Sequence, residues 1–309
     1  MNCLVLGGAG FIGSHLVDAL VGKGHRVRVF DLPNISTENL DGCRGVIEIC
    51  GGDFENRRAV SEALTGIDVA VHLVSTTLPG PSNENPAYDV ETNVIGSIRF
   101  LEEAIRQGVG KVIFVSSGGT VYGIPEVLPI PETHPTLPIC SYGISKLAVE
   151  KYLALFHHLH GLDYTILRLG NPYGERQRSE SVQGAVAVFL GRLLRKESIT
   201  LWGDGTVARD YFHIEDLTRA LLLAVESDLP SRVYNVGSGK ATSLLDILET
   251  MGTVTGLRPA VRFTAARKLD VPVNCLDIGK IGRETGWLPA VSLEKGIART
   301  WAWMKGKVR

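Results

Sequence analysis

The chain lacks several features that define common classes of protein. Its five cysteines are scattered and odd in number, and none falls in a Cys-x-x-Cys pair or at a Cys/His metal-ligand spacing. We therefore expect reduced thiols and no bound metal. The formal net charge is −1, charged residues make up 21% and hydrophobic residues 44%. This balance argues against a disordered chain and against a basic nucleic-acid-binding protein, and it favours a small-molecule partner.

Long hydrophobic runs are also missing. No apolar stretch approaches the roughly 18 residues that suggest a membrane span. The chain begins directly with a strand-like run instead of a charged segment, an apolar stretch and a cleavage site. We expect no signal peptide, no membrane association and a cytoplasmic location. A length of 309 residues suits one large α/β domain or two closely joined lobes.

The most informative stretch is a glycine-rich turn near the N-terminus. The apolar run at residues 2–6 leads into Gly7, Gly10 and Gly13. Glycines at this spacing allow a tight turn, the approach of a pyrophosphate and close packing of the next helix, whose N-terminus favours a phosphate. A second apolar run follows and ends in Asp31, where an acid receives the ribose hydroxyls and repels a 2′-phosphate. The order strand, turn, helix, strand and acid predicts an NAD site.

Strands and helices continue to alternate after Asp31. Further strands are predicted at residues 46–49, 69–74 and 111–115, and long helices at 86–107 and from residue 142 onward. This alternation implies right-handed βαβ units and a doubly wound parallel sheet. Ligands bind such sheets at the carboxyl ends of the strands, so the polar loops after the strands are candidate site segments.

Two polar residues in this half have two interpretations each. Asp53, just past the third predicted strand, either accepts a hydrogen bond from an adenine amino group or caps the next helix. Asn93, inside the helix at 86–107, is either solvated or bonds a neighbouring backbone and shapes an active-site loop. The residues themselves leave both questions open.

A tyrosine and a lysine at the start of the long helix from residue 142 carry the chemistry. Tyr142 and Lys146 lie one turn apart on one helix face. A phenol with a pKa near ~10 is a poor base at neutral pH, but a neighbouring ammonium, helped by an oxidised nicotinamide, lowers that pKa. Because the pair follows a dinucleotide turn and a strand ending in Ser116 and Ser117, the spacing favours a catalytic role.

Together these motifs resemble the extended short-chain dehydrogenase/reductases of the NAD-dependent nucleotide-sugar epimerase/dehydratase group, with UDP-glucose 4-epimerase-like members. The similarity includes the glycine turn and then Asp31, Asp53 and segments 116–123, 142–146, 167–174, 199–217, 234–239 and 267–270. The resemblance implies a Rossmann NAD-binding domain at residues 1–171. It also implies a smaller, mainly substrate-binding α/β lobe at residues 172–309, with segments that return to the Rossmann domain.

The resemblance further implies an enzyme that inverts C4 of a nucleotide sugar, with UDP as the expected nucleotide. Tyr142 as phenolate would remove the O4 proton while NAD⁺ takes the C4 hydride, giving a transient 4-keto sugar. Lys146 would tune Tyr142 and hold the nicotinamide ribose. Ser117 is the expected hydroxyl for O4, with Thr120 and Ser116 as alternatives, because the usual position is Gly118 here.

Two sets of binding residues follow from the same resemblance. For NAD they are Gly7, Gly10, Phe11, Ile12, Gly13, Asp31, Asp53, Phe54, Leu73, Val74, Ser75, Asn93, Ser116, Tyr142, Lys146 and Pro172. For the nucleotide sugar they are Ser117, Tyr142, Asn171, Thr200, Leu201, Arg209, Arg267, Asp270 and Asn274. Guanidinium groups suit a diphosphate, although Arg209 and Arg267 could each be a surface ion-pair partner. Asn274 stands where narrow-substrate relatives have a bulky tyrosine, so we expect room for an N-acetyl group.

Two other functions remain open from the sequence. One is a nucleotide-sugar 4,6-dehydratase or 4-ketoreductase, although dehydratases place an Asp-Glu pair where this chain has Gly119 and Thr120. The other is a non-catalytic dinucleotide-sensing protein, which the Tyr142 and Lys146 pair disfavours. The family also leads us to expect a homodimer formed through the helices at 86–107 and 142–159.

Overall fold

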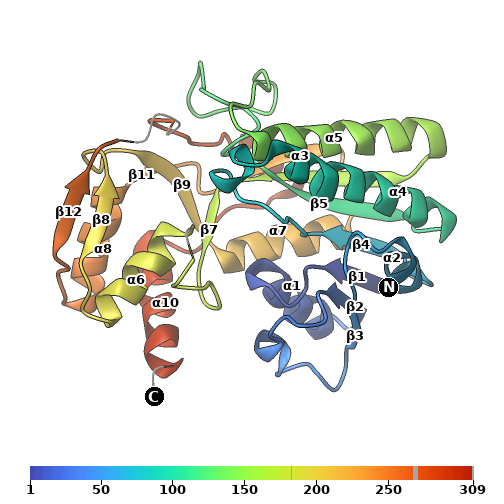
Figure 1. Ribbon diagram of the computed structural model, residues 1–309, viewed down its shortest axis with the longest axis horizontal. Helices are drawn as coiled ribbons and strands as arrows, with labels where there is room; N and C mark the ends of the chain where they lie inside the picture. Colours follow the sequence, from blue (N-terminus) through green and yellow to red (C-terminus); the bar gives the residue numbers. More distant parts are fainter. Residues whose placement is uncertain (182, 267–270, 308–309) are drawn as a thin grey trace. The chain divides into compact units, whose positions relative to one another are not determined.

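The computed structural model describes residues 1–181, 183–266 and 271–307. The chain forms two compact units, each assembled from several stretches (Figure 1). The first unit comprises residues 1–123, 135–168 and 218–234. The second comprises residues 124–134, 169–217 and 235–309. Each unit has its own sheets and its own hydrophobic core.

The first unit is built around a seven-stranded sheet in the order β10-β6-β5-β4-β1-β2-β3. Its strands are β1 (Asn2–Leu6), β2 (Arg26–Asp31), β3 (Glu48–Gly51), β4 (Val69–His72), β5 (Lys111–Ser117), β6 (Asp163–Leu169) and β10 (Val233–Val236). The neighbouring strands β3, β2, β1, β4 and β5 pair in parallel in that order. In β1, Leu6 lies opposite Phe30 of β2 on one side and His72 of β4 on the other. The strand order reverses between β1 and β4, which is the switch point where ligands bind. The predicted doubly wound parallel sheet is confirmed.

Helices cover both faces of this sheet. They are α1 (Phe11–Gly22), α2 (Arg57–Leu64), α3 (Pro86–Asp89), α4 (Gly96–Arg106), α5 (Ser141–His160) and α7 (Ile214–Glu226), with the short turns η1 (Glu38–Leu40) and η2 (Pro81–Asn83). Figure 1 shows α4 and α5 along one face, with α1 and α7 on the other. The single helix predicted at 86–107 is divided, because residues Val90–Ile95 (η3) are wound as a π-helix between α3 and α4. Such π segments occur often at functional sites.

The core of the first unit explains its nearly uninterrupted apolar strands. Phe30, Phe54, Phe100 and Phe114 are all buried in one cluster with the aliphatic side chains of β1 and β5. Because helices cover both faces of the sheet, residues on either side of a central strand are buried. Each large apolar side chain so buried contributes about 1.5–3 kcal/mol.

The second unit contains a three-stranded sheet, a two-stranded sheet and four helices within the described ranges. These elements are β7 (Asn171–Tyr173), β8 (Ile199–Trp202), β9 (Ala208–His213), β11 (Ala241–Ser243), β12 (Val261–Thr264), α6 (Ala185–Leu194), α8 (Leu244–Thr255), α9 (Gly279–Thr285) and α10 (Leu293–Lys307). Strand β9 pairs with β7 in parallel and with β11 in antiparallel fashion, and β8 pairs with β12 in parallel. Helix α10 buries Ile297, Trp301 and Met304 in the core of this unit.

Two features are absent from the described residues. Between residues 1 and 307, apart from the undescribed positions, no helix is long and apolar enough to cross a membrane. The same part of the chain holds no group of three or more His, Cys, Asp and Glu side chains that could bind a metal ion.

Candidate active site

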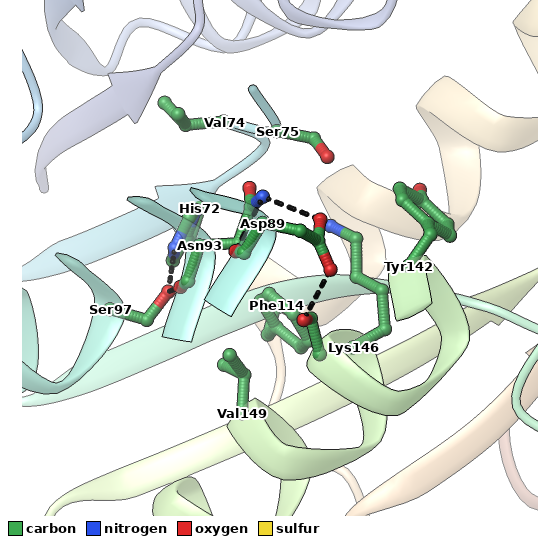
Figure 2. Close-up of a pocket in the computed structure, with 11 residues that line it drawn as sticks. His72, Val74, Ser75, Asp89, Asn93, Ser97, Phe114, Tyr142, Lys146 and Val149 are labelled. Carbon is green, nitrogen blue, oxygen red and sulfur yellow. Dashed lines mark hydrogen bonds between the residues drawn. The ribbon is translucent and has the colours of Figure 1, made fainter. Parts of the chain in front are cut away.

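A pocket lies beside helix α5 in the first unit (Figure 2). Its walls come from β4 and the loop that follows it, from the α3–η3–α4 helix, from β5 and from α5. The lining residues are His72, Val74, Ser75, Asp89, Asn93, Ser97, Phe114, Tyr142, Ser145, Lys146 and Val149. The pocket therefore brings the predicted Tyr142 and Lys146 together with Asn93, at the carboxyl edge where such a sheet binds its ligands.

Tyr142 and Lys146 project from adjacent turns of α5 into this pocket (Figure 2). The Lys146 ammonium lies 5.6 Å from the centroid of the Tyr142 ring and 4.8 Å from that of Phe114. Its Nζ atom donates a hydrogen bond to the carbonyl of Val115 at 3.1 Å. The helical spacing holds the two side chains together, and strand β5 anchors the lysine.

Burial shifts the acid–base behaviour of both groups. Desolvation raises the pKa of Tyr142 to about 12, although a hydrogen bond with Ser75 acts in the opposite direction. Desolvation lowers the pKa of Lys146 to about 8, against the effect of the Asp89 and Glu150 carboxylates. We expected the neighbouring ammonium to lower the pKa of Tyr142. In the structure, loss of hydration shifts the pKa of the Tyr142 phenol in the opposite direction. The lowering expected from Lys146 together with an oxidised nicotinamide stays a prediction.

The three candidate hydroxyls have different surroundings. Ser116 is buried and donates to Oε1 of Glu150 at 2.6 Å, so its hydroxyl is already engaged. Ser117 ends β5 and is partly exposed. The Thr120 hydroxyl is buried and has no hydrogen-bond partner within the described chain. The geometry therefore removes Ser116 from the candidates and leaves Ser117 and Thr120.

The glycine turn between β1 and α1 fits a bound dinucleotide. Gly7 has a φ of +81°, which a side chain would strain. A Cβ atom on Gly13 would lie 2.3 Å from the carbonyl oxygen of Gly7, so helix and strand approach each other as the motif requires. Gly10 caps α1 without a side-chain hydrogen bond. No capping side chain therefore occupies the first N–H groups of the helix, at Phe11 and Ile12, and they are available to an anion.

The two predicted carboxylates at the strand ends differ in their contacts. Asp31 accepts a hydrogen bond from the Ala9 N–H at 3.0 Å and so joins the end of β2 to the glycine turn. Asp53 is exposed and accepts from the Glu55 N–H at 2.9 Å. The cap of α2 is Asn56, whose side chain accepts from the helix backbone. The helix-cap interpretation of Asp53 is therefore wrong, and the adenine interpretation stays a prediction.

The loop after β4 passes next to the glycine turn. A Cβ atom on Gly7 would lie 3.5 Å from backbone atoms of both Leu73 and Val74. Farther along the loop, the Thr76 N–H donates to Oδ1 of Asn93 at 3.0 Å. The second interpretation of Asn93 therefore holds, because its side chain bonds a neighbouring backbone and shapes this loop.

Two residues predicted to contact ligands have core side chains. Phe54 is 7% exposed and lies with its ring centroid 5.0 Å from that of His72. Leu201 is 1% exposed and packs in the core of the second unit. A ligand at either position can therefore meet backbone atoms only.

The remaining predicted residues lie in the second unit. Asn171 and Pro172 belong to β7, Thr200 belongs to β8, and all three are partly exposed. Arg209 in β9 donates to the carbonyls of Ala208 at 2.8 Å and Val271 at 2.6 Å. Asn274 is fully buried, and its N–H donates to the Ala208 carbonyl at 3.1 Å. Arg267 and Asp270 lie outside the described residues.

Six of the eleven lining residues were not predicted from the sequence, and Asp89 is one of them. Its carboxylate is 0% exposed and accepts hydrogen bonds from the hydroxyls of Ser141 and Ser145 at 2.8 and 2.6 Å. A signal was present, because Asp89 precedes Asn93 by one helical turn and residues at that spacing share a face.

The doubly wound sheet, the glycine turn and the Tyr–Lys pair define an extended short-chain dehydrogenase/reductase. The chain belongs to the NAD dependent epimerase/dehydratase family, whose model matches residues 3–237. It is 35% identical to a putative UDP-glucose 4-epimerase of Methanocaldococcus jannaschii over 307 residues, 99% of each chain.

Solved structures agree with this assignment. The UDP-glucose 4-epimerase of Thermotoga maritima, crystallised with UDP-glucose, superposes with a TM-score of 0.94 at 38% identity over 100% of both chains. The UDP-glucose 4-epimerase of Thermus thermophilus, in complex with NAD, has a TM-score of 0.92 at 34% identity over 99% of both chains. The predicted family and fold are confirmed.

Proposed function

We propose that this chain inverts C4 of a UDP-sugar and keeps NAD bound between turnovers. The observation that carries the proposal is the pocket in which Tyr142 and Lys146 lie together beside the switch point of the sheet. The similarity to UDP-glucose 4-epimerases, which extends over almost the whole chain, supports the same reaction.

The cofactor is proposed to bind around the glycine turn between β1 and α1. The glycine turn and the N-terminus of α1 would hold the pyrophosphate, Asp31 the adenosine ribose and Lys146 the nicotinamide ribose. NAD supplies, when bound, the acceptor and donor of the C4 hydride. The chain's own side chains bind and orient the sugar and transfer the proton at O4.

Tyr142 is the proposed proton acceptor and donor at O4 of the sugar. A phenol whose pKa burial raises to about 12 needs positive charge beside it to release its proton. Lys146, one turn along α5, is the cation that the chain itself provides. Ser117, partly exposed at the end of β5, is proposed to donate to O4 and hold it toward Tyr142. General acid–base groups of this kind contribute about 10²–10⁴-fold each.

Apart from Ser117 and Tyr142, the proposed nucleotide-sugar residues come from the second unit. Arg209 carries a guanidinium suited to a diphosphate, and its hydrogen bonds to backbone carbonyls hold it in one orientation. Asn171 and Thr200 are proposed as polar contacts to the nucleotide. Asn274 is proposed to leave space for an N-acetyl group on the sugar.

Dehydration and 4-ketoreduction are the alternatives. A 4,6-dehydratase needs a carboxylic acid and a base beside C5 and C6, and this chain has Gly119 and Thr120 where the family places that pair. The carboxylate that does line the pocket, Asp89, is engaged by hydrogen bonds from α5. These observations favour epimerisation.

A homodimer is proposed through the outer faces of the helices at 86–107 and 142–159. Ile144, Leu155 and Leu159 are 53%, 43% and 59% exposed and recur at helical spacing on α5. Tyr88 and Ile95 add exposed apolar area on the neighbouring helix. Light scattering should give twice the chain mass for the wild type and a monomer for Leu155→Glu/Leu159→Glu. A monomeric wild type would contradict the proposal.

The function is tested by incubating purified protein, without added cofactor, with UDP-glucose, UDP-N-acetylglucosamine or their uronic acids, and recording proton NMR spectra. We expect the C4 epimer of at least one of them. A 4-keto-6-deoxy product would indicate a dehydratase, and turnover only with added NAD(P)H would indicate a reductase. Either outcome would overturn the proposal.

A further inference from the structure

Asp89, at the end of α3, joins three segments that build the pocket (Figure 2). Its Oδ2 accepts from the hydroxyls of Ser141 and Ser145 on α5. Its Oδ1 accepts from the Asn93 amide at 3.0 Å and from the hydroxyl of Thr77 in the loop after β4. We propose that Asp89 is a positioning residue for the reaction proposed above, on which this inference rests. It fixes the first two turns of α5 against that loop.

The spacing of the two serines makes this contact relevant to the chemistry. Ser141 directly precedes Tyr142, and Ser145 directly precedes Lys146. Residues four apart share a helix face, so Asp89 holds one face of α5 at two successive turns. A change in that contact would move the phenol and the ammonium together.

The site requires a carboxylate in particular. An ionised carboxylate offers about four acceptor positions, and four donor groups reach Asp89, two at each oxygen. An asparagine has one accepting oxygen and an NH₂ group that would face donors. Asp89→Asn therefore keeps the shape of the side chain while it breaks about half of the network.

The same helix connects Asp89 to the loop through Asn93. The Asn93 amide also donates to the Asp89 carbonyl at 3.1 Å, while its oxygen receives the Thr76 N–H. The N-terminus of α5 is held independently, because the Tyr142 N–H donates to the Ser82 hydroxyl at 3.0 Å. Loss of the Asp89 contacts should therefore shift α5 without releasing the helix.

The charge of Asp89 gives a second observable. The groups that face Lys146 are Asp89 from α3, Glu150 and Tyr142 from α5, and His72 from β4. Burial lowers the pKa of His72 to about 3, so it is neutral at neutral pH. The Asp89 carboxylate raises the pKa of both Tyr142 and Lys146. Its removal should lower both values and move the whole pH–activity profile toward acid.

The experiment compares wild type, Asp89→Asn and Ser145→Ala as full-length proteins. For Asp89→Asn we expect kcat to fall about 10²-fold, as for a misplaced catalytic group, with KM changed less than about threefold. Both limbs of its pH profile should move to lower pH. Ser145→Ala removes one donor but no charge, so its kcat should fall about 10-fold with both limbs in place.

A matched control separates positioning from simple loss of stability. Asp216 is also fully buried, and its carboxylate accepts from the N–H groups of Ala290 and Val291 in the second unit. Asp216→Asn should lower the melting temperature while kcat per folded molecule and the pH profile stay at wild-type values. If Asp89→Asn behaved like this control, the inference would be overturned.

A readout independent of turnover keeps the two proposals distinguishable. The ¹³Cε resonance of Lys146, assigned with Lys146→Arg, reports its titration by NMR. We expect its midpoint at lower pH in Asp89→Asn than in wild type. An inactive wild type would refute the proposed function while this shift still supported the contact between Asp89 and the lysine. An unmoved midpoint would overturn the inference whatever the activity.

Discussion

Ser116 donates its hydroxyl to the Glu150 carboxylate at 2.6 Å, and both residues are buried. Arg168 binds the same carboxylate with two of its nitrogens, and its third donates to the Tyr122 hydroxyl at 3.0 Å. Strand β5, helix α5 and strand β6 are thereby connected behind the pocket. The first serine of the pair thus has a structural contact, and the second is the one that we propose for the substrate.

This relationship predicts opposite effects of two neighbouring substitutions. Ser117→Ala should lower kcat about 10²-fold through the loss of the O4 contact, with unfolding unchanged. Ser116→Ala should destabilise the protein by about 1–3 kcal/mol, because it removes a donor from a buried carboxylate, while kcat stays within about threefold. Steady-state kinetics and urea unfolding separate the two. Thr120→Val tests the other candidate hydroxyl. A larger loss of kcat in Thr120→Val than in Ser117→Ala would assign the O4 contact to Thr120 instead of Ser117.

The buried pair of Glu150 and Arg168 should behave as a unit. Arg168→Met alone should cost about 3–5 kcal/mol of unfolding free energy, because it leaves a buried carboxylate without its cation. The double variant Glu150→Met/Arg168→Met should cost less than the sum of the two single variants. Urea unfolding of the four proteins completes the cycle. Additive losses would show that the two side chains act separately.

His72 should make the protein sensitive to acid. Its ring lies among Phe54, Phe100 and Phe114 at centroid distances of 5.0, 5.4 and 5.3 Å, and burial lowers its pKa to about 3. The unfolded chain, with a histidine pKa near ~6.5, therefore binds more protons below that pH, and stability falls as the pH falls.

The test compares wild type with His72→Gln, so that titrations common to both cancel. The unfolding free energy of the wild type should fall by about 2 kcal/mol more than that of His72→Gln between pH 7 and pH 5. Parallel curves for the two proteins would mean that His72 binds protons equally in the folded and unfolded chains, and would contradict its lowered pKa.

Substrate range should depend on Asn274. We expect Asn274→Tyr to lose turnover of UDP-N-acetylglucosamine and to retain that of UDP-glucose, because the larger tyrosine side chain fills the proposed N-acetyl space. Asn274 is fully buried, so the melting temperature of the variant must be measured beside its kinetics. Equal losses with both sugars in a folded variant would refute the specificity role.

The features that the sequence predicts well are local ones. The glycines at positions 7, 10 and 13, the acid after the next strand and the four-residue spacing of Tyr142 and Lys146 each express their chemistry within one turn or one element. Such patterns are readable without knowledge of the tertiary structure. They are sufficient to predict the sheet, the family and the residues at the centre of the pocket.

Features set by tertiary contacts were missed. Strand β3 was expected at residues 46–49 but runs from Glu48 to Gly51, because its register is set by pairing Gly51 with Asp31. The π-helical turn and the four donors around Asp89 likewise depend on segments distant in sequence. The rise in the Tyr142 pKa depends on burial, which the spacing of two residues does not reveal.

The central claim is tested most directly by the fate of the hydrogen at C4. UDP-glucose carrying deuterium at C4 is incubated in ordinary water with the wild type and with Tyr142→Phe, and the product is analysed by NMR and mass spectrometry. We predict UDP-galactose that retains the deuterium, and a loss of about 10³-fold in rate for Tyr142→Phe. Product that had exchanged its deuterium for solvent hydrogen, or a fully active Tyr142→Phe, would contradict the account.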